Sequence, residues 1–240
     1  MMATTTIEWT EASWNPVTGC TKISEGCRNC YAERMALRLK AMGQSNYSRG
    51  FEITFHENMM QLPLKWKRPQ MIFVNSMSDL FHEDIPLPVI QRIFKVMNDA
   101  PSHTFQVLTK RSKVLLEYHK FLDWTPNIWM GVTVESQDYV SRIDDLRNTG
   151  AHVKFISFEP LLSGIDHVNL ESIDWLIVGG ESGPGARSIK EEWVTALRDK
   201  SVAAGIPFFF KQWGGFAKKK RGRLLDGREW SQLPGSRQFV

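Results

Sequence analysis

Long apolar runs are absent from this 240-residue sequence. No segment approaches the roughly 18 consecutive apolar residues of a membrane-spanning helix. The first residues, MMATTTIEWTEAS, also lack the basic stretch and apolar stretch of an export signal. These absences predict a cytoplasmic protein that has no membrane partner.

Several familiar catalytic motifs are also missing. The six histidines form neither an H-x-x-x-H pair nor an H-x-x-C pair, and there is no G-x-S-x-G motif. A zinc hydrolase and a serine hydrolase are therefore poorly supported. The glycine-rich segment GGESGPG (179–185) lacks the Gly-Lys-Ser/Thr ending of a phosphate-binding loop and the G-x-G-x-x-G spacing of a dinucleotide site.

Cysteine is scarce, but the three cysteines present are clustered within eleven residues, at Cys20, Cys27 and Cys30. An odd number disfavours a closed set of disulfides, and a cytosolic redox poise would keep the thiols reduced. Three thiolates leave one position of a tetrahedral metal, or one iron of a [4Fe–4S] cube, without a protein ligand. The cluster therefore predicts a metal site with an open position. A structural metal site (zinc or iron–sulfur) and three incidental thiols are the alternatives.

The pattern of apolar residues predicts an α/β fold with parallel strands. Amphipathic helical stretches alternate with short β-branched and aromatic runs, at 71–76, 104–109, 128–134, 153–158, 175–180 and 206–211. A weaker strand is expected near residues 5–9, followed by the cysteine loop and a helix over 31–42. The alternation over six units predicts a right-handed parallel architecture.

We expect one domain over residues 1–240. Within it, residues 1–67 form the cysteine-loop unit with an insertion, which holds a short extended piece and a helix. Residues 68–213 form the β/α units, and residues 214–240 form a basic C-terminal tail.

Polar residues stand where each predicted strand runs into its following loop. Since the carboxyl ends of parallel strands converge on one mouth where ligands bind, we expect these side chains to share a site. The candidates are Ser76, Ser78, Asp79, Lys110, Glu135, Glu159, Glu181 and Lys211.

Positive charge is concentrated near the C-terminus, although the net charge of the whole chain is only +4. A basic cluster of this kind can meet phosphates, so nucleic acid is a candidate partner. The alternative is a solvated tail. The cluster consists of Lys218, Lys219, Lys220, Arg221, Arg223 and Arg228.

The cysteine segment resembles the radical S-adenosylmethionine superfamily, and especially its spore photoproduct lyase-like branch. The shared features are the N-P-x-x-G-C lead-in (15–20), the glycine before Cys27 and the C-Y-A-x-R sequence (30–34). NSMSD (75–79) and LTK (108–110) resemble further motifs of that branch. Two features depart from the superfamily: six residues separate Cys20 from Cys27 instead of the usual three, and Asn29 replaces the common aromatic residue. The chain as a whole looks most like a phage- and prophage-associated family with this three-cysteine signature.

The resemblance implies a partial (β/α)6-type TIM-like barrel and an enzyme of bacterial or phage-infected host cytoplasm. Cys20, Cys27 and Cys30 would ligate a [4Fe–4S] cluster, with S-adenosylmethionine on the fourth iron. An external electron donor would reduce the cluster, and a 5′-deoxyadenosyl radical would abstract hydrogen from an unknown substrate, with nucleic acid a candidate.

The resemblance also suggests roles for the polar strand ends. Ser76, Ser78 and Asp79 would contact the methionyl amino group, and Lys110 and Glu135 the carboxylate and ribose. Substrate or further cofactor contacts would fall to Glu159, Glu181 and Lys211. The competing hypothesis is a nucleic-acid-binding or processing protein in which the metal at the cysteines is structural.

Overall fold

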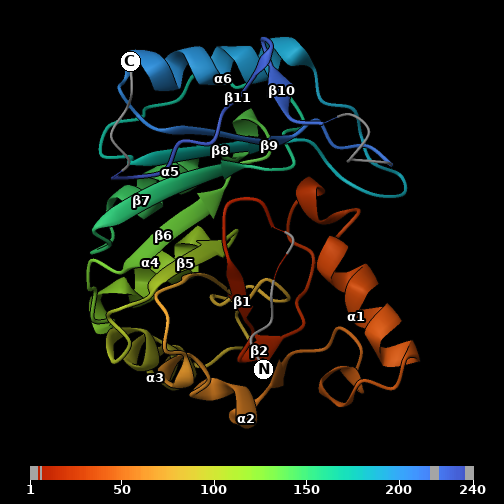
Figure 1. Cartoon of the computed structure of the whole chain (residues 1–240), viewed down its shortest axis with the longest axis vertical. Coiled ribbons are helices and arrows are strands. Elements are labelled where there is room, and N and C mark those ends of the chain that lie inside the picture. The colour runs from red at the N-terminus through yellow and green to blue at the C-terminus, as the bar shows by residue number, and fades with distance from the viewer. Residues whose placement is uncertain (1–4, 6, 217–221, 236–240) are drawn as a thin grey trace.

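The protein folds around a curled, seven-stranded parallel sheet that forms a half-barrel (Figure 1). The computed structural model describes residues 5, 7–216 and 222–235. This architecture confirms the predicted α/β class and the partial TIM-like barrel. The strands follow chain order across the sheet: β1 (Ala12–Trp14), β4 (Met71–Val74), β5 (Thr104–Thr109), β6 (Ile128–Thr133), β7 (Val153–Phe158), β8 (Trp175–Gly179) and β9 (Phe208–Gln212).

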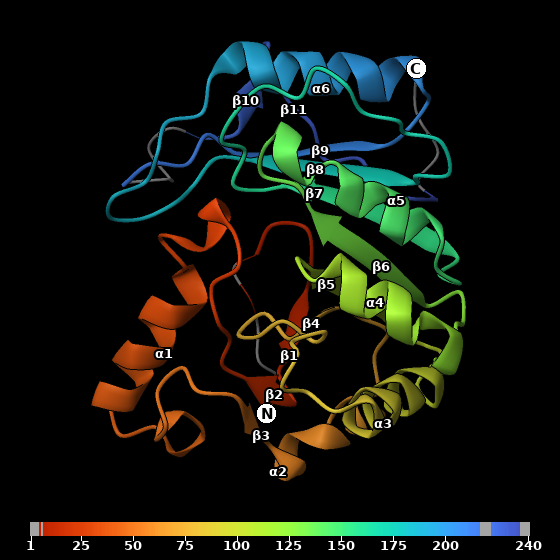
Figure 2. The ribbon, with the colours of Figure 1, turned by 180° about the vertical axis from the view of Figure 1, so that it is seen from behind.

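Helices cover the convex face of the sheet, as the views from both sides show (Figures 1 and 2). They are α3 (Leu87–Asn98), α4 (Ser112–Tyr118), α5 (Ser141–Arg147) and α6 (Glu191–Ala203). Short 3-10 turns η4 (His119–Phe121) and η5 (Gln137–Tyr139) follow α4 and precede α5. Each crossover returns the chain to the next parallel strand, which places all strand carboxyl ends on one side.

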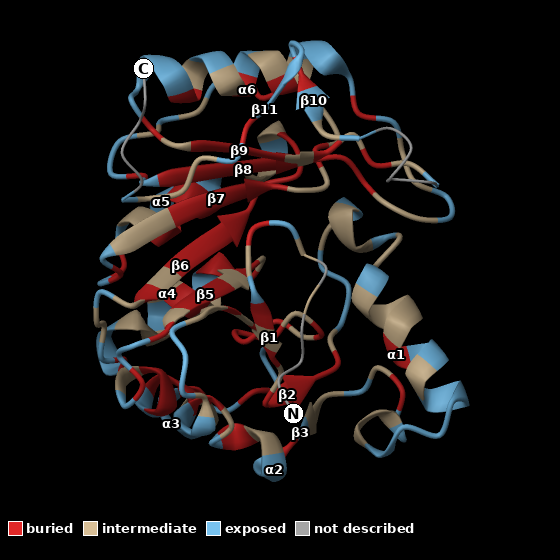
Figure 3. Ribbon diagram, in the orientation of Figure 1, coloured by how far each residue is buried: buried red, intermediate tan, exposed pale blue. Residues whose placement is uncertain are grey.

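Side chains alternate between the two faces of the sheet, as the two-residue period of a strand requires. In β8, Leu176 and Val178 join the large core under the helices, whereas Trp175 and Ile177 face the inside of the half-barrel. The strands are buried on both faces (Figure 3). This explains why they appear in the sequence as continuous apolar runs.

An aromatic layer fills the inside of the half-barrel toward the amino ends of the strands. Its buried members are Trp9, Phe155, Trp175, Ile177 and Phe209, and Phe73 and Trp129 pack against them. The ring centroids of Trp9 and Phe73 lie 4.7 Å apart. This layer, the aromatic floor, fills the interior of the half-barrel below the carboxyl ends of the strands.

The segment between β1 and β4 forms a separate layer beside the half-barrel. It contains β2 (Val17–Thr18), which pairs antiparallel with β3 (Thr54–Phe55). It also contains η1 (Glu25–Cys27), α1 (Tyr31–Ala41), η2 (Ser45–Tyr47), α2 (Glu57–Met60) and η3 (Pro63–Lys65). The expected helix after the cysteines, and the short extended piece and helix before residue 67, are thus confirmed.

Two expectations about the elements are wrong. The first strand lies at Ala12–Trp14 and not near 5–9, because residues 7–9 contribute their apolar side chains to the aromatic floor. No helix connects β7 to β8, although regular alternation predicts one. The connection 159–174 instead runs as irregular chain and buries Leu161, Ile165 and Ile173.

The C-terminal part of the described chain covers the last strand. The hairpin of β10 (Leu224–Leu225) and β11 (Arg228–Glu229) leads into residues 230–232. These residues run antiparallel along β9, with hydrogen bonds from Phe210 N to Trp230 O (2.9 Å) and from Gln232 N to Phe208 O (3.2 Å). Among the residues described, no helix combines the length and apolar character needed to cross a bilayer.

Candidate functional site

The three cysteines lie on one loop that leaves the carboxyl end of β1. The loop is fixed at its start by a bridge between Gly19 and Ser78, whose Oγ donates to the Gly19 carbonyl at 2.6 Å. Cys20 follows directly, Cys27 ends η1, and Cys30 immediately precedes α1. The loop thus lies at the mouth of the half-barrel.

All three thiols are free and partly exposed. Burial, and then the carboxylate of Asp79, raise the pKa of the Cys20 thiol to about 11, against the opposing charge of Arg111. Burial also acts to raise the pKa of Cys27. There, however, the Lys110 ammonium and hydrogen bonds from the loop outweigh it and bring that pKa below its usual value.

Asp79 lies at the carboxyl end of β4, where the sequence predicts it, and its two oxygens are fully engaged. Oδ1 accepts from Thr109 Oγ1 at 2.6 Å and from Phe81 N at 3.1 Å. Oδ2 accepts from Lys110 N at 3.0 Å and from Arg111 Nη1 at 3.2 Å. The carboxylate therefore ties β4 to the end of β5.

The two predicted serines make local contacts at the same strand end. Ser76 Oγ donates to Asn15 Oδ1 at 3.2 Å, while Ser78 holds Gly19 as described above. Asn75 before them has a positive φ of 56°, a conformation that asparagine tolerates better than most residues. Both serines thus lie beside the lead-in of the cysteine loop.

Lys110 and Glu135 stand at the ends of β5 and β6 on the inner side of the half-barrel. Their closest charged atoms, Lys110 Nζ and Glu135 Oε1, are 3.8 Å apart. Glu135 is fully buried and accepts from Arg142 Nη1 at 2.7 Å and from Ser24 Oγ on the cysteine loop. The Lys110 side chain stays 22% exposed, so its ammonium has donors left for a ligand.

Glu159 and Lys211 form an ion pair across β8, at the far side of the mouth. Lys211 Nζ lies 2.8 and 3.0 Å from the two Glu159 oxygens, and Gln212 Nε2 donates to Oε1 at 2.9 Å. The pair spans Gly179, where an added Cβ would come within 3.3 Å of the Glu159 carboxyl carbon. The structure therefore brings these two predicted residues together, apart from the cysteine loop.

Glu181 lies in the glycine-rich loop after β8 and binds the cysteine segment. Its Oε2 accepts from Asn29 Nδ2 at 3.0 Å, and Arg187 donates to both oxygens, at 2.7 Å from Nη2 and 3.0 Å from Nε. Burial acts to raise the pKa of Glu181, but the hydrogen bonds from Arg187 and Asn29 outweigh it and lower that pKa to about 2. Glu181 is therefore an anion at every ordinary pH.

Several site residues are absent from the set that the sequence predicts. Arg111 and Arg187 contact the cysteine loop directly, and Arg142 holds Glu135. Arg111 follows Lys110 and so stood at a predicted strand end. Arg142 and Arg187 lie seven and six residues beyond their carboxylate partners, and no spacing rule identifies such pairs.

The described side chains do not form a compact site for a single metal ion. Among the described residues, no three histidine, cysteine, aspartate or glutamate side chains lie close enough together to hold one metal ion. A zinc site requires four donors within about 2.3 Å of one ion. A cubane is less demanding, because each cysteine binds a different iron.

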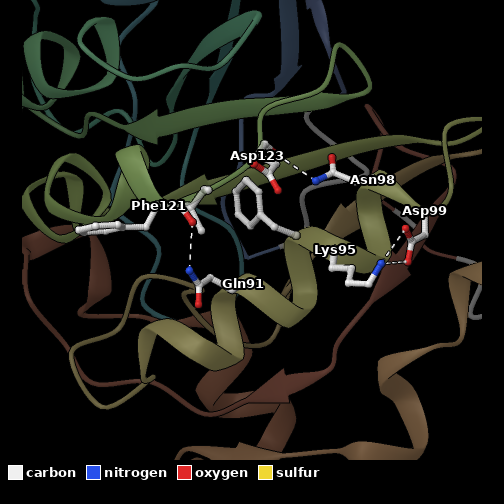
Figure 4. Close-up of a pocket in the computed structure, with 8 residues that line it drawn as sticks. Gln91, Lys95, Asn98, Asp99, Phe121 and Asp123 are labelled. Atoms are coloured by element: carbon white, nitrogen blue, oxygen red, sulfur yellow. Dashed lines mark hydrogen bonds and ion pairs between the residues drawn. The ribbon is translucent and has the colours of Figure 1, made fainter.

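Two other features lie away from the mouth. A cavity of about 360 Å³ opens between α3 and the segment 121–123, near the amino ends of the strands (Figure 4). Its polar side chains are already used within its wall: Asn98 Nδ2 donates to Asp123 O and Lys95 pairs with Asp99. Of the basic tail (214–240), residues 217–221 and 236–240 lie outside the described residues, including Lys218, Lys219, Lys220 and Arg221. Arg223 and Arg228 stack on Phe209 and Trp230.

The fold resembles two solved structures of spore photoproduct lyase. One is a complex with dinucleoside spore photoproduct (TM-score 0.48, 13% identity). The other is a double mutant with bound AdoMet and dinucleoside spore photoproduct (TM-score 0.49, 11% identity). Each match covers 75% of this chain and 58% of the other, so the chain spans less than two thirds of those proteins.

One family model matches most of the chain. No curated protein matches the chain. The family model described as "Protein of unknown function (DUF5131)" matches residues 4–234, and the chain belongs to that family.

Proposed function

We propose that this chain is a radical S-adenosylmethionine-type enzyme. In this proposal Cys20, Cys27 and Cys30 ligate a [4Fe–4S] cluster and S-adenosylmethionine binds beside them in the mouth. The observation that carries the proposal is the position of the three free thiols, on one loop at the carboxyl ends of seven parallel strands.

The charges around the thiols support an anionic cluster. Arg111 Nη1 lies 3.4 Å from Cys20 Sγ, and the Lys110 ammonium acts on Cys27. Three thiolates add three negative charges to the iron–sulfur core, and nearby cations and hydrogen bonds stabilise such a group.

A cluster bound by the three cysteines would supply the electron for reductive cleavage of the carbon–sulfur bond of S-adenosylmethionine, which releases methionine and provides the chemistry for hydrogen abstraction from substrate. The protein's own residues would bind the cofactor and the substrate and shield them from water. The free donors of Lys110 fit a carboxylate, and the Glu159–Lys211 pair offers an acceptor and a donor to a polar substrate group. The aromatic floor would present an apolar surface below a bound cofactor.

A structural zinc site is the less favoured alternative. It needs convergence of donors on one ion, and the described side chains do not provide it. Nothing described at the mouth favours a purely nucleic-acid-binding role.

The proposal is tested on full-length protein prepared without oxygen. We expect iron and acid-labile sulfide close to four per chain, and release of 5′-deoxyadenosine from S-adenosylmethionine under a strong reductant. Single Cys→Ser variants at 20, 27 and 30 should lose both, whereas Ser45→Ala, in an exposed turn, should lose neither. Stoichiometric zinc without iron, or iron without cofactor cleavage, would overturn it.

A further inference from the structure

The widened cysteine loop carries its own attachment points. Six residues separate Cys20 from Cys27, and four of them contact side chains at the strand ends. The four are Thr21, Ser24, Glu25 and Gly26, and each meets a charged side chain from the segment that follows β5, β6 or β8. The additional length therefore provides contacts that a shorter loop would lack.

The first attachment is the guanidinium of Arg111, whose side chain is only 2% exposed. Its Nη2 donates to the Thr21 carbonyl and to Thr21 Oγ1, both at 3.0 Å. Its Nη1 lies between Cys20 Sγ (3.4 Å) and Asp79 Oδ2 (3.2 Å). The two terminal nitrogens of this rigid fork thus fix the start of the loop against the strand ends, while Nε donates to Glu83 Oε2 at 2.8 Å.

The second attachment is Glu135 at the end of β6. It accepts from Ser24 Oγ, and the loop backbone lies so close that a Cβ on Gly26 would be 2.5 Å from Glu135 Oε1. Arg142 holds the other oxygen at 2.7 Å. The middle of the loop therefore rests directly on a buried, paired carboxylate.

The third attachment is Glu181, working with Asn29 and Arg187. Asn29 Nδ2 bridges Glu181 Oε2 (3.0 Å) and the Gly185 carbonyl (2.9 Å). Arg187 Nη2 binds Glu181 Oε1 and also the Glu25 carbonyl at 2.9 Å. The aromatic residue usual at position 29 in the resembling superfamily has no amide to make this bridge.

We propose that Arg111, Glu135 and Glu181 are positioning residues that hold the cysteine loop in its ligand-bearing form before any ligand binds. Both oxygens of Glu135 and of Glu181 are already occupied by loop or arginine donors. The two carboxylates therefore act on the cysteines through the loop. Only the description of the cysteines as cluster ligands rests on the proposed function.

The test measures amide hydrogen exchange over residues 20–30 in the metal-free, full-length protein. Glu181→Gln and Asn29→Ala should speed exchange in this segment by about tenfold or more, since each removes charge-assisted hydrogen bonds to the loop. Glu159→Gln is the matched control: it alters another ion-paired strand-end carboxylate that does not touch the loop, and it should leave segment 20–30 unchanged. Circular dichroism verifies that each variant is folded.

Two further measurements distinguish a positioning role of Glu181 from a role as a ligand of the cofactor. Iron incorporation after reconstitution should fall in Glu181→Gln, while the dissociation constant for S-adenosylmethionine, corrected for iron content, should match that of the wild type. Unchanged exchange in both loop variants would overturn the inference. So would normal exchange and iron content combined with lost S-adenosylmethionine affinity, which would make Glu181 a cofactor ligand. Because the exchange is measured without metal, failure of the enzymatic proposal leaves this test intact.

Discussion

Gly131 shows how a single missing side chain shapes the inside of the half-barrel. It lies in β6 with its Cα facing Phe155 of the aromatic floor, and an added Cβ would be 2.4 Å from that ring. We expect Gly131→Ala to destabilise the fold by about 2 kcal/mol, the usual cost of overpacking a tight core. Urea unfolding measures the change.

Phe155→Leu provides the control for this prediction. In the double variant the smaller side chain makes room for the added methyl group, so the two losses should be less than additive. Strict additivity, or a single Gly131→Ala variant as stable as the wild type, would contradict the packing argument.

Glu181 should make the stability of the protein depend on pH in the acid range. Burial acts to raise its pKa, but the hydrogen bonds from Arg187 and Asn29 lower it from 4.5 to about 2. A carboxylate with a lowered folded-state pKa stabilises the fold above its unfolded value, and this contribution is lost as the pH falls from about 4.5 toward 2. The stability advantage of wild type over Glu181→Gln should shrink over that interval and stay constant above it. An advantage that is independent of pH would exclude the ion pair as its source.

At the scale of elements, the strands could be predicted because they are buried on both faces. The expected runs 104–109 and 153–158 match β5 and β7 residue for residue. β1 could not be found in this way, since it is three residues long and places polar Ser13 between Ala12 and Trp14.

The candidate site, like the strands, could be predicted from the sequence only in part. The strand-end positions follow from the parallel topology, so the mouth could be predicted from the sequence. The partners of its carboxylates could not, because Ser24 meets Glu135 from 111 residues away and Asn29 meets Glu181 from 152. Such pairings depend on how the cysteine loop folds back across the mouth, and no local pattern encodes that.

Helix α1 buries fewer side chains than the helices on the convex face. It buries only Ala36, whereas α3 buries five side chains, among them Ile90, Ile93 and Phe94. Figure 3 shows the same contrast. We expect the amides of α1 to exchange faster than those of α3 by at least about tenfold, because local opening exposes little apolar surface. Hydrogen-exchange mass spectrometry checks this, and equal protection of the two helices would contradict it.

At the scale of the whole molecule, a half-barrel has two edges that a closed barrel lacks. Beyond β1, the cysteine segment reaches the loop after β8: Arg34 donates to the Ser182 and Pro184 carbonyls at 2.9 and 3.0 Å. Side-chain contacts to backbone thus bridge the open side at the mouth. The edge at β9 is covered by backbone instead, because residues 230–232 pair with it directly.

The pairing of residues 230–232 with β9 should keep the protein from associating through that edge. Removing residues 230–240 exposes the polar backbone of Phe208 and Phe210, together with the apolar surface that Trp230 covers. An uncovered, flat, apolar edge strand is a template for pairing with another chain. We therefore expect the shortened chain to form dimers and larger species as its concentration rises, measured by sedimentation velocity. Removing only residues 236–240 keeps the pairing residues and serves as the control, which should sediment like the full chain. If the chain that lacks residues 230–240 sediments like this control, residues 230–232 do not protect the edge.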